Sequence, residues 1–553
     1  MKFVHVTSER GIATLIALIM VGMLTLIGLA ALSTSDDEVT IAGNELQEMR
    51  AFYAAEAGLE DAAAALQNEY EETGAPPTTM PSGTLELNNC AVTYRTVDDG
   101  APTQRTLTQG TLAGLHALVK SFTITSLAAN PVDGARIQMS QSFETALVPI
   151  FQFAVFYGND LEIAPGAEMT LIGRVHSNGN LWVQCASTLR MDSYVTASGD
   201  ILHGRKGPGS IDNGDVLIKN AAGNYVSMKE PSGWLEASDS YWFDSSLARW
   251  QGRVQDASHG QSELNLPLTD VDDPHKIIEP AASNPDSYEN KATLKCIEGT
   301  WYQKTGGIWQ DVTAGMQAAG VINTTANKFY DGREGTNVDV VDLDVGALYS
   351  SGYAPDNGVI YFSETPSATS TNNYPALRLN NGATLGDGLT IASENPVYTK
   401  GNFNSVDKKP ASILADALTI LSGSFNDNKT NPIYWDKYDR PAVNTTVNCS
   451  YLTGNVETTS SDYNGGFENL PRFLENWSGI DFNWKGSAVN LWNSVQADGN
   501  WNGSYYNPPR RNWQYDTDLD DPNKLPPESP VVRVFQRTGW KQEDVGYGIA
   551  MSE

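Results

Sequence analysis

The feature that most constrains this chain is an apolar run from Gly11 to Ser33, 23 residues without a charged side chain. A helix of this length spans the roughly 30 Å hydrocarbon core of a bilayer. Lys2 and Arg10 precede the run, and an acidic stretch beginning at Asp36 follows it. Because basic residues favour the cytoplasmic side, the run predicts a membrane-spanning helix with the N-terminus in the cytoplasm and the following residues outside. A secretory signal has a shorter apolar region with its small-residue cleavage site after it.

Residues 39–66 extend the helical signal beyond the membrane. They contain no proline and are rich in Ala, Leu, Glu and Gln, which are strong helix formers. Together with the apolar run they predict one helix of about 50 residues, on the order of 75 Å long, which Gly43 could soften. We expect one apolar face on its outer half, formed by Leu46, Met49, Tyr53, Leu59, Ala63 and Leu66. The prolines of residues 67–83 end the helix.

The stretch AGNELQEMRAFYAAEAGLEDA and the short basic leader ending at Gly11 resemble the N-terminus of type IV pilins, and more narrowly of PilX-type minor pilins. The resemblance covers residues 8–65. It implies cleavage between Gly11 and Ile12 by a prepilin peptidase, methylation of the new N-terminus, and transfer of the helix from the inner membrane into a filament core. The core-forming residues that it implies are Ile16, Leu18, Val21, Leu24 and Leu29.

One position departs from the pilin pattern. Most pilins carry glutamate at the fifth mature position, where this chain has Ile16. The departure argues against a major pilin more than against a pilin-like subunit, since some minor pilins and tip pseudopilins also lack this glutamate. The alternative is a plain signal anchor with a coiled stalk.

Composition restricts the ligands and cofactors. With 36 Lys and Arg against 66 Asp and Glu, the net charge is −30, which repels nucleic acid and favours solubility outside the cell. The widely separated Cys90, Cys185, Cys296 and Cys449 leave disulfides and buried thiols both open. Neither the cysteines nor the six histidines have metal-binding spacing, so we expect no metal and no cofactor.

Three β-like runs follow the helix, at Thr84–Thr96, Ala117–Leu127 and Ala135–Val148. The last two alternate between apolar and polar residues. Pilins pack an antiparallel sheet on the exposed half of their helix, so the resemblance implies that these runs form such a sheet.

An internal repeat begins after Phe151. Residues 174–183 (RVHSNGNLWV) and 194–203 (YVTASGDILH) align at an offset of 20, and a third copy runs from Val397 to Phe403. A 20-residue period with short strands predicts a parallel β-solenoid. Its turns would use positive-φ corners at Gly179, Asn180, Gly199, Asp200, Gly401 and Asn402. An antiparallel sandwich with Gly-rich hairpins is the alternative.

These patterns predict a mainly β protein with one long N-terminal α-helix, in which a pilin-like helix and small antiparallel sheet precede a β-solenoid with a large insertion. The predicted segments are a leader (1–11), the filament-core and exposed helix halves (12–35 and 36–72), a pilin-like β segment (73–150), the first solenoid part (151–204), an insertion (205–375), the second solenoid part (376–465) and an aromatic, Pro-rich C-terminal region (466–553). Residues 151–545 also resemble large proteins known only by a PilX-like N-terminal segment, which implies no chemistry.

Two side-chain clusters bear on enzyme or metal chemistry. Asp272, Asp273, His275 and Glu279 are a candidate acidic cluster, but they lie in the predicted insertion beside Pro274. Asp516, Asp518 and Asp520 have the opening spacing of a calcium loop, although Asp521 and Pro527 exclude an EF-hand. A looser Ca²⁺ site and a solvated acidic loop both remain open. We interpret His176 as a hydrogen-bonding turn residue and expect no catalytic residues.

The sequence therefore indicates a non-enzymatic minor pilin or pseudopilin-like subunit of a type IV pilus or type II secretion-like filament, at the tip or in a priming role. The expected partners are other pilins, the prepilin peptidase, the inner membrane before assembly, and a surface glycan or protein ligand, with no nucleic acid. The expected locations are the inner membrane for the precursor and the cell surface afterwards. A surface adhesin or structural protein anchored by the helix is the second hypothesis, and a polysaccharide-active β-helix enzyme is the third.

Overall fold

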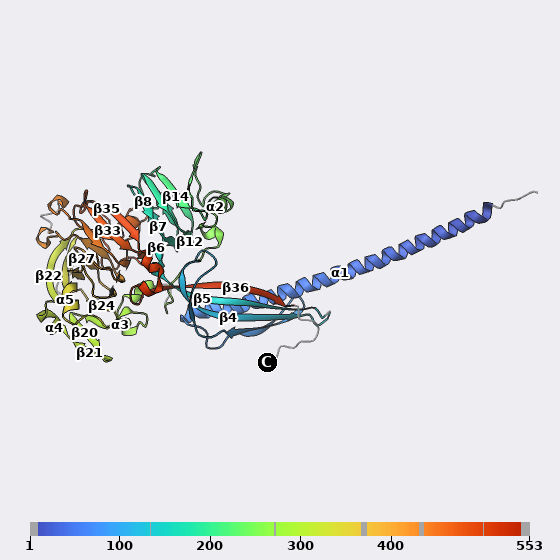
Figure 1. The fold of residues 1–553 in the computed structure, drawn as a ribbon, viewed down its shortest axis with the longest axis horizontal. Helices are drawn as coiled ribbons and strands as arrows, with labels where there is room; N and C mark the ends of the chain where they lie inside the picture. Colours follow the sequence, from blue (N-terminus) through green and yellow to red (C-terminus); the bar gives the residue numbers. More distant parts are fainter. Residues whose placement is uncertain are drawn as a thin grey trace, which may run out of the picture. The chain divides into compact units, whose positions relative to one another are not determined.

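The structure is a computed structural model that describes residues 9–132, 134–269, 273–366, 373–430, 436–501 and 503–543. Most of the predicted leader, Asp272 and the last part of the predicted C-terminal region lie outside the described residues. The chain divides into two compact units (Figure 1). The helix unit contains the residues up to Pro102, Lys120–Thr145 and the residues from Phe535 on; the β-rich unit contains Thr103–Val119 and Ala146–Val534.

The helix unit is built on α1 (Glu9–Thr73), a single helix of 65 residues. The prediction of one continuous helix through the apolar run is confirmed, and α1 ends at Thr73, one residue beyond the predicted exposed half (36–72). It ends where Gly74 adopts a positive φ of 73° and donates its N–H to the carbonyl of Tyr70. Glycine is favoured at this position because it takes the left-handed conformation without a steric cost.

An antiparallel sheet packs on the second half of α1 (Figure 1). Its order is β1-β2-β4-β5-β36. The bounds are β1 (Ser82–Leu87), β2 (Cys90–Asp98), β4 (His116–Ala129), β5 (Arg136–Pro149) and β36 (Val531–Glu543), and β3 (Thr103–Thr106) pairs with the start of β4. The predicted strand Thr84–Thr96 is a hairpin, because Asn88 and Asn89 adopt positive φ and turn the chain.

Small residues bring α1 close to this sheet. Ala51, Ala54, Ala55 and Ala62 have no exposed surface, and a Cβ at Gly58 would lie 2.4 Å from the Ser126 hydroxyl. The predicted single apolar face is wrong. Leu59, Ala63 and Leu66 are buried, whereas Leu46, Met49 and Tyr53 are 45–56% exposed. At 100° per residue the two groups point about 110° apart, so they form separate stripes.

The β-rich unit begins with three parallel ladders. The first joins β6 (Phe153–Tyr157), β9 (Arg174–Ser177), β12 (Val195–Ala197) and β18 (Val254–Gln255). The second joins β7 (Leu161–Ile163), β10 (Leu181–Val183) and β13 (Ile201–His203), and the third joins β8 (Met169–Leu171), β11 (Thr188–Met191) and β14 (Asp215–Lys219). The register pairs Leu161, Leu181 and Ile201, so the 20-residue offset of the sequence is the offset between paired strands.

A second group of strands continues the first ladder from its other edge. Strand β6 also pairs in parallel with β34, and the resulting sheet has twelve strands. Its further strands are β31 (Ser450–Thr453), β28 (Ala411–Ala415), β26 (Leu389–Ser393), β24 (Val359–Ser363), β19 (Leu294–Ile297), β20 (Thr300–Thr305) and β21 (Ile308–Asp311), with β34 at Ala488–Asn490. Because β19, β20 and β21 pair antiparallel, this sheet mixes both kinds of pairing.

Two more sheets belong to this group. One contains β22 (Ile322–Asp331), β23 (Thr336–Asp344), β25 (Tyr374–Asn380), β27 (Val397–Lys400), β29 (Leu418–Leu421) and β32 (Arg472–Phe473). The other contains β30 (Thr445–Val447), β33 (Asp481–Gly486) and β35 (Arg510–Tyr515). The third repeat copy starts in β27, which belongs to a different sheet from Val175 and Val195. Strands β19, β23 and β24 fall within the predicted insertion and pair with neighbours in these ladders.

The remaining elements of the β-rich unit are short. They are β15 (Tyr225–Ser227), β16 (Lys229–Glu230), β17 (Gly233–Trp234), α2 (Trp242–Trp250), α3 (Tyr288–Lys291), α4 (Thr313–Ala318) and α5 (Val345–Ser350), with several 3-10 turns. The segment FENLPRFLENW (467–477) could form a short helix by its sequence, but it does not. A 3-10 turn at Phe467–Asn469 leads into β32 there, because Phe473 joins the buried core beside β29.

The turns of the repeat differ from their expected conformation. Gly401 has a positive φ of 76°, but Gly179, Gly199, Asn180, Asp200 and Asn402 do not. Glycine is needed at Gly179 and Gly199 for a different reason. A Cβ there would lie 2.4 Å from the side-chain oxygen of Asp160 or Asn180. Those oxygens accept the N–H groups of Asn180 and Asp200, at 2.8 Å in each case, so the residues form a ladder from coil to coil.

We expect Gly58→Ala to destabilise the helix unit by about 1–3 kcal/mol, because the new methyl group would force Ser126 and Val92 out of contact distance. The control Gly43→Ala, at a helical position with no atom within 4 Å, should be neutral or stabilise by up to about 1 kcal/mol. Thermal unfolding of the full chain in detergent measures both. Equal effects of the two substitutions would contradict close packing at Gly58.

We expect Gly199→Ala to destabilise the β-rich unit by about 1–3 kcal/mol, because its Cβ would displace Asn180 from the coil-to-coil ladder. Gly166→Ala, at a site with no atom within 4 Å, is the matched control and should leave stability nearly unchanged. Tryptophan fluorescence during urea unfolding reports on this unit, since of the 13 tryptophans only Trp540 belongs to the helix unit. If Gly199→Ala unfolds at the same urea concentration as the wild type, the ladder tolerates a side chain at this position.

Candidate functional site

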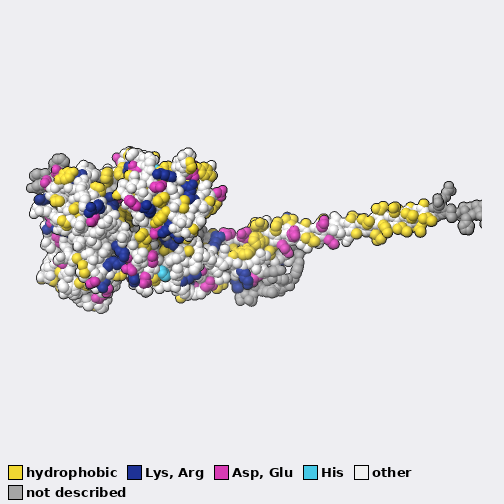
Figure 2. Space-filling model, turned by 45° about the horizontal axis from the view of Figure 1, so that its top comes forward, with side chains coloured by type: hydrophobic (Ala, Val, Ile, Leu, Met, Phe, Trp, Pro, Cys, Tyr) yellow, Lys and Arg dark blue, Asp and Glu magenta, His cyan; other side chains and the backbone are white. Residues whose placement is uncertain are grey.

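The first half of α1 is the largest apolar surface of the helix unit, and Figure 2 shows it without any cover. All the predicted core residues are exposed: Ile16 50%, Leu18 75%, Val21 63%, Leu24 68% and Leu29 59%. Ile12, at the predicted cleavage site, is 62% exposed. Gly11 lies on the same helix. Within the described residues, this helix alone is long and apolar enough to cross a membrane.

Two threonine side chains on this half of α1 form hydrogen bonds to the backbone of the helix itself. The hydroxyl of Thr25 donates to the carbonyl of Val21 at 2.7 Å, and that of Thr34 donates to Ala30 at 2.9 Å. A polar group in lipid needs such an internal partner because no water is present there. This half of α1 is therefore suited to lipid or to a bundle of other helices.

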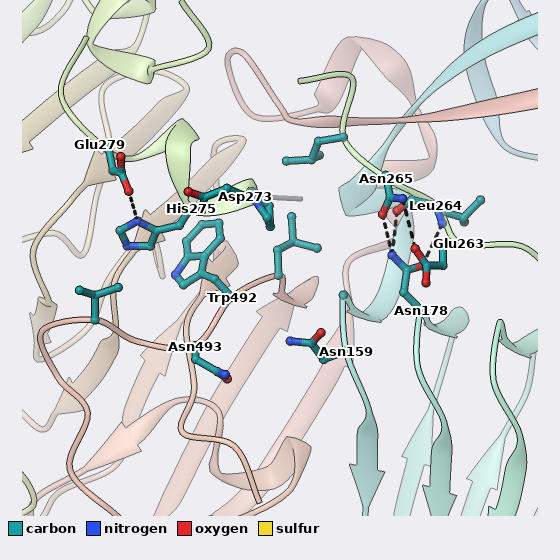
Figure 3. A pocket seen from close by; sticks show the side chains of 15 residues that line it. Asn159, Asn178, Glu263, Leu264, Asn265, Asp273, His275, Glu279, Trp492 and Asn493 are labelled. Atoms are coloured by element: carbon teal, nitrogen blue, oxygen red, sulfur yellow. Dashed lines mark hydrogen bonds and ion pairs between the residues drawn. The ribbon is translucent and has the colours of Figure 1, made fainter. Parts of the chain in front are cut away.

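The β-rich unit contains a cleft of about 540 Å³, shown in Figure 3. It lies where β9, β6 and β34 end side by side, and the loop after each strand supplies lining residues, including Asn178, Asn159 and Asn493. Two further segments complete the walls. One is the extended stretch around Leu264, and the other is the turn that carries Asp273 and His275.

Asn178 is the most firmly held residue of the cleft. Its side-chain oxygen accepts the N–H of Leu264 at 2.9 Å, and its amide donates to the Leu264 carbonyl at 3.2 Å and to Asn265 Oδ1 at 3.1 Å. Behind it, His176 bonds Asn178 Oδ1 through Nε2 and Thr196 through Nδ1. His176 is fully buried, and burial lowers its pKa to about 4. It is therefore a neutral structural residue. The sequence analysis expected a hydrogen-bonding turn residue, but His176 lies within strand β9, where its side chain does form hydrogen bonds.

His275 and Glu279 form the opposite wall. His275 Nδ1 lies 2.8 Å from Glu279 Oε1, Lys276 contacts the same carboxylate at 2.9 Å, and His275 packs edge-on against Trp492. Burial opposes ionisation of Glu279, but the hydrogen bonds from His275 and Lys276 outweigh it and lower its pKa. Asp273, His275 and Glu279 thus line one cleft as their sequence proximity suggested, while Asp272 lies outside the described residues.

The cleft has no positively charged wall. Among its 15 described lining residues there is no lysine or arginine, and the charged ones are Glu263, Asp273 and Glu279. Asn159 and Asn493 are exposed, and neither side-chain amide makes a hydrogen bond within the described chain. Sequence reasoning missed Asn159, Trp492 and Asn493, because residues more than 300 positions apart meet only through the pairing of β6 with β34.

Lysine side chains pair with two of the carboxylates of the predicted acidic loop. Lys408 bonds both Asp516 and Asp518, Lys485 lies 3.3 Å from Asp516, and Lys524 lies 2.9 Å from Asp518. The hydrogen bonds from Lys408 and Lys524 lower the pKa of Asp518 to about 2. The third residue, Asp520, accepts from the Tyr515 hydroxyl at 2.8 Å. Within the described chain no group of three His, Cys, Asp or Glu residues is arranged to hold a metal.

All four cysteines are buried, and none of them forms a disulfide. Burial raises the pKa of Cys449 to about 12 and raises that of Cys296 and Cys185 as well. Because the thiolate is the reactive form, these cysteines are unreactive core residues. Several tryptophans of the C-terminal region are also buried, with Trp484 edge-on to Trp513 and Phe473 edge-on to Trp477, whereas Trp540 is 51% exposed.

Comparison with known proteins identifies no family. No family model matches the chain, and a search of curated proteins finds no match. Among solved structures, it is similar to the competence-associated pilin ComZ from Thermus thermophilus. The two share 11% sequence identity over 90% of this chain and 97% of that chain, with a TM-score of 0.27.

We expect His176→Gln to reduce the acid sensitivity of the β-rich unit. The unfolded chain protonates this histidine near pH 6.5, but the folded chain does so only near pH 4, so its stability falls as the pH drops through this interval. Glutamine does not take up this proton, so the dependence of the free energy of unfolding on pH should weaken by about 1 kcal/mol per pH unit. Urea unfolding between pH 6.5 and 4.5, followed by tryptophan fluorescence, measures the slope. An unchanged slope would contradict a neutral buried imidazole.

Proposed function

We propose that this chain is a non-enzymatic, PilX-like minor pilin or pseudopilin subunit of a type IV pilus or type II secretion-like filament, at the tip or in a priming position. The observation that carries the proposal is the division of α1. Its first half is bare and apolar, and its second half is fixed to an antiparallel sheet by small side chains. A subunit that moves from a membrane into a helical filament core requires these two properties in one helix.

The apolar half supports a position at the end of a filament. In pilins a glutamate at the fifth mature position would balance the N-terminal amine of a neighbouring subunit. Here that position is Ile16, and the segment from Ile12 to Ser35 has no carboxylate. A subunit without a neighbour on that side needs no such charge. The precursor would reside in the inner membrane, and the assembled form at the cell surface.

The β-rich unit supports the same placement by its size. We interpret its 20-residue parallel ladders as a β-solenoid that is presented outside the cell. A body of roughly 400 residues would crowd a tightly packed shaft if every subunit carried one. A tip or priming subunit is present in few copies and avoids this crowding.

Processing tests the proposal directly. We expect mass spectrometry of the mature protein, produced with a prepilin peptidase, to find an N-terminus at Ile12, and Gly11→Leu to retain the leader because the bulky side chain blocks the cleavage site. Gly22→Leu, on the same apolar helix with no atom within 4 Å, is the control and should be processed normally. An intact leader in the wild type, or cleavage beyond the apolar run, would overturn the proposal in favour of an anchored or secreted protein.

A further inference from the structure

We propose that the cleft between the strand ends of β9, β6 and β34 binds an uncharged carbohydrate chain. The site is the set of loops that carry Asn178, Asn159 and Asn493, together with the walls formed by residues 263–266 and 273–279. The inference concerns the β-rich unit alone and does not depend on the filament role proposed above.

The three asparagines form a row because their strands are in register. Tyr157 of β6 pairs with Ser177 of β9 and with Asn490 of β34, so the loops that follow leave the sheet at one edge. Neighbouring strands lie about 4.8 Å apart, which places an amide-bearing loop at each strand step. Figure 3 shows the side chains of Asn159 and Asn493 on neighbouring loops below the Trp492 ring. A linear ligand can therefore contact successive loops along the cleft.

Two of these amides are available to a ligand. The side-chain amides of Asn159 and Asn493 are exposed and make no hydrogen bond within the described chain, whereas Asn178 is held by Leu264, Asn265 and His176. A carboxamide offers both a donor and an acceptor, and a sugar hydroxyl offers the same pair. Rigid strand ends position the free amides in advance, which reduces the entropy lost on binding.

The charges of the cleft disfavour an anionic ligand but do not require a cationic one. Its three carboxylates and the absence of lysine or arginine from its described lining disfavour phosphate, sulfate and uronate groups. All three carboxylates already have partners. Glu279 contacts His275 and Lys276, and Glu263 accepts from the Asn265 amide at 3.3 Å. Asp273 lies 3.5 Å from Lys276. Because each carboxylate is already bonded within the chain, we expect a neutral polar ligand in preference to a basic peptide.

The dimensions agree with this ligand class. About 540 Å³ lies within the range of roughly 300–1,000 Å³ that is usual for small-ligand sites. The cleft is also lined by the buried side chains of Leu266, Leu491 and Trp492, so apolar groups lie among its polar ones. Carbohydrate sites combine these two features, since sugar rings have apolar faces and polar edges.

Isothermal titration calorimetry of the full chain, in a zwitterionic detergent without a sugar headgroup, tests the inference. The neutral probes are cellohexaose, chitohexaose and maltohexaose, and hexalysine and an oligogalacturonate are the charged probes. We expect one-to-one binding of at least one neutral probe and none of the oligogalacturonate. Asn159→Ala and Asn493→Ala should each weaken binding about tenfold, as loss of a hydrogen bond to ligand predicts.

Asn213→Ala is the matched control, since Asn213 is an exposed asparagine of the same unit outside the cleft. It should bind like the wild type. Binding of none of the neutral probes, binding of hexalysine that Asn159→Ala weakens, or equal losses in all three variants would overturn the inference. Filament assembly separates this result from the proposed function: the cleft variants should assemble normally, and failed leader processing would leave carbohydrate binding intact.

Discussion

The pairing of β34 with β6 is the interaction on which the β-rich unit depends. It joins residues 488–490 to residues 155–157, more than 300 positions earlier, and makes one twelve-stranded sheet from two groups of ladders. The Ser487 hydroxyl donates to the Phe153 carbonyl at 2.6 Å, and the Gly158 N–H donates to Asn490 at 2.7 Å, so the junction is bonded on both sides. Each group buries an edge strand that would otherwise expose unpaired backbone groups. The same junction creates the cleft.

The features predicted from the sequence are those that depend on residues close together in the chain. The uncharged run and the Ala-rich segment gave α1 because both halves favour a helix independently of any contact. The repeat gave the 20-residue register because equivalent residues occupy equivalent strand positions. The copy that begins at Val155 was missed, since Asn159 stands where the later copies have glycine. Strand β7 is the last described strand of its ladder (β13-β10-β7), so no further Asp or Asn side chain from that ladder approaches Asn159 as Asp160 approaches Gly179.

Long-range contacts account for what the sequence did not predict. Strand β36 completes the sheet on α1 from the far end of the chain, and its residues show no regular alternation that would have marked it in the sequence. In the cleft, Asp273, His275 and Glu279 were recognisable because they are neighbours in sequence, but their contacts are mostly with one another and with Lys276. Asn159 and Asn493 had no signal of their own, since a single asparagine in a loop is usually a turn residue.

The exposed half of α1 is an apolar surface that is costly to leave in water. Thirteen large apolar side chains between Ile12 and Leu32 are 48–75% exposed. Full burial of one such side chain contributes about 1.5–3 kcal/mol, so covering this surface is worth on the order of 20 kcal/mol. That exceeds the roughly 5–15 kcal/mol by which a typical domain is stable. A surface of this size and composition favours lipid or a bundle of other helices as the environment of this half of α1.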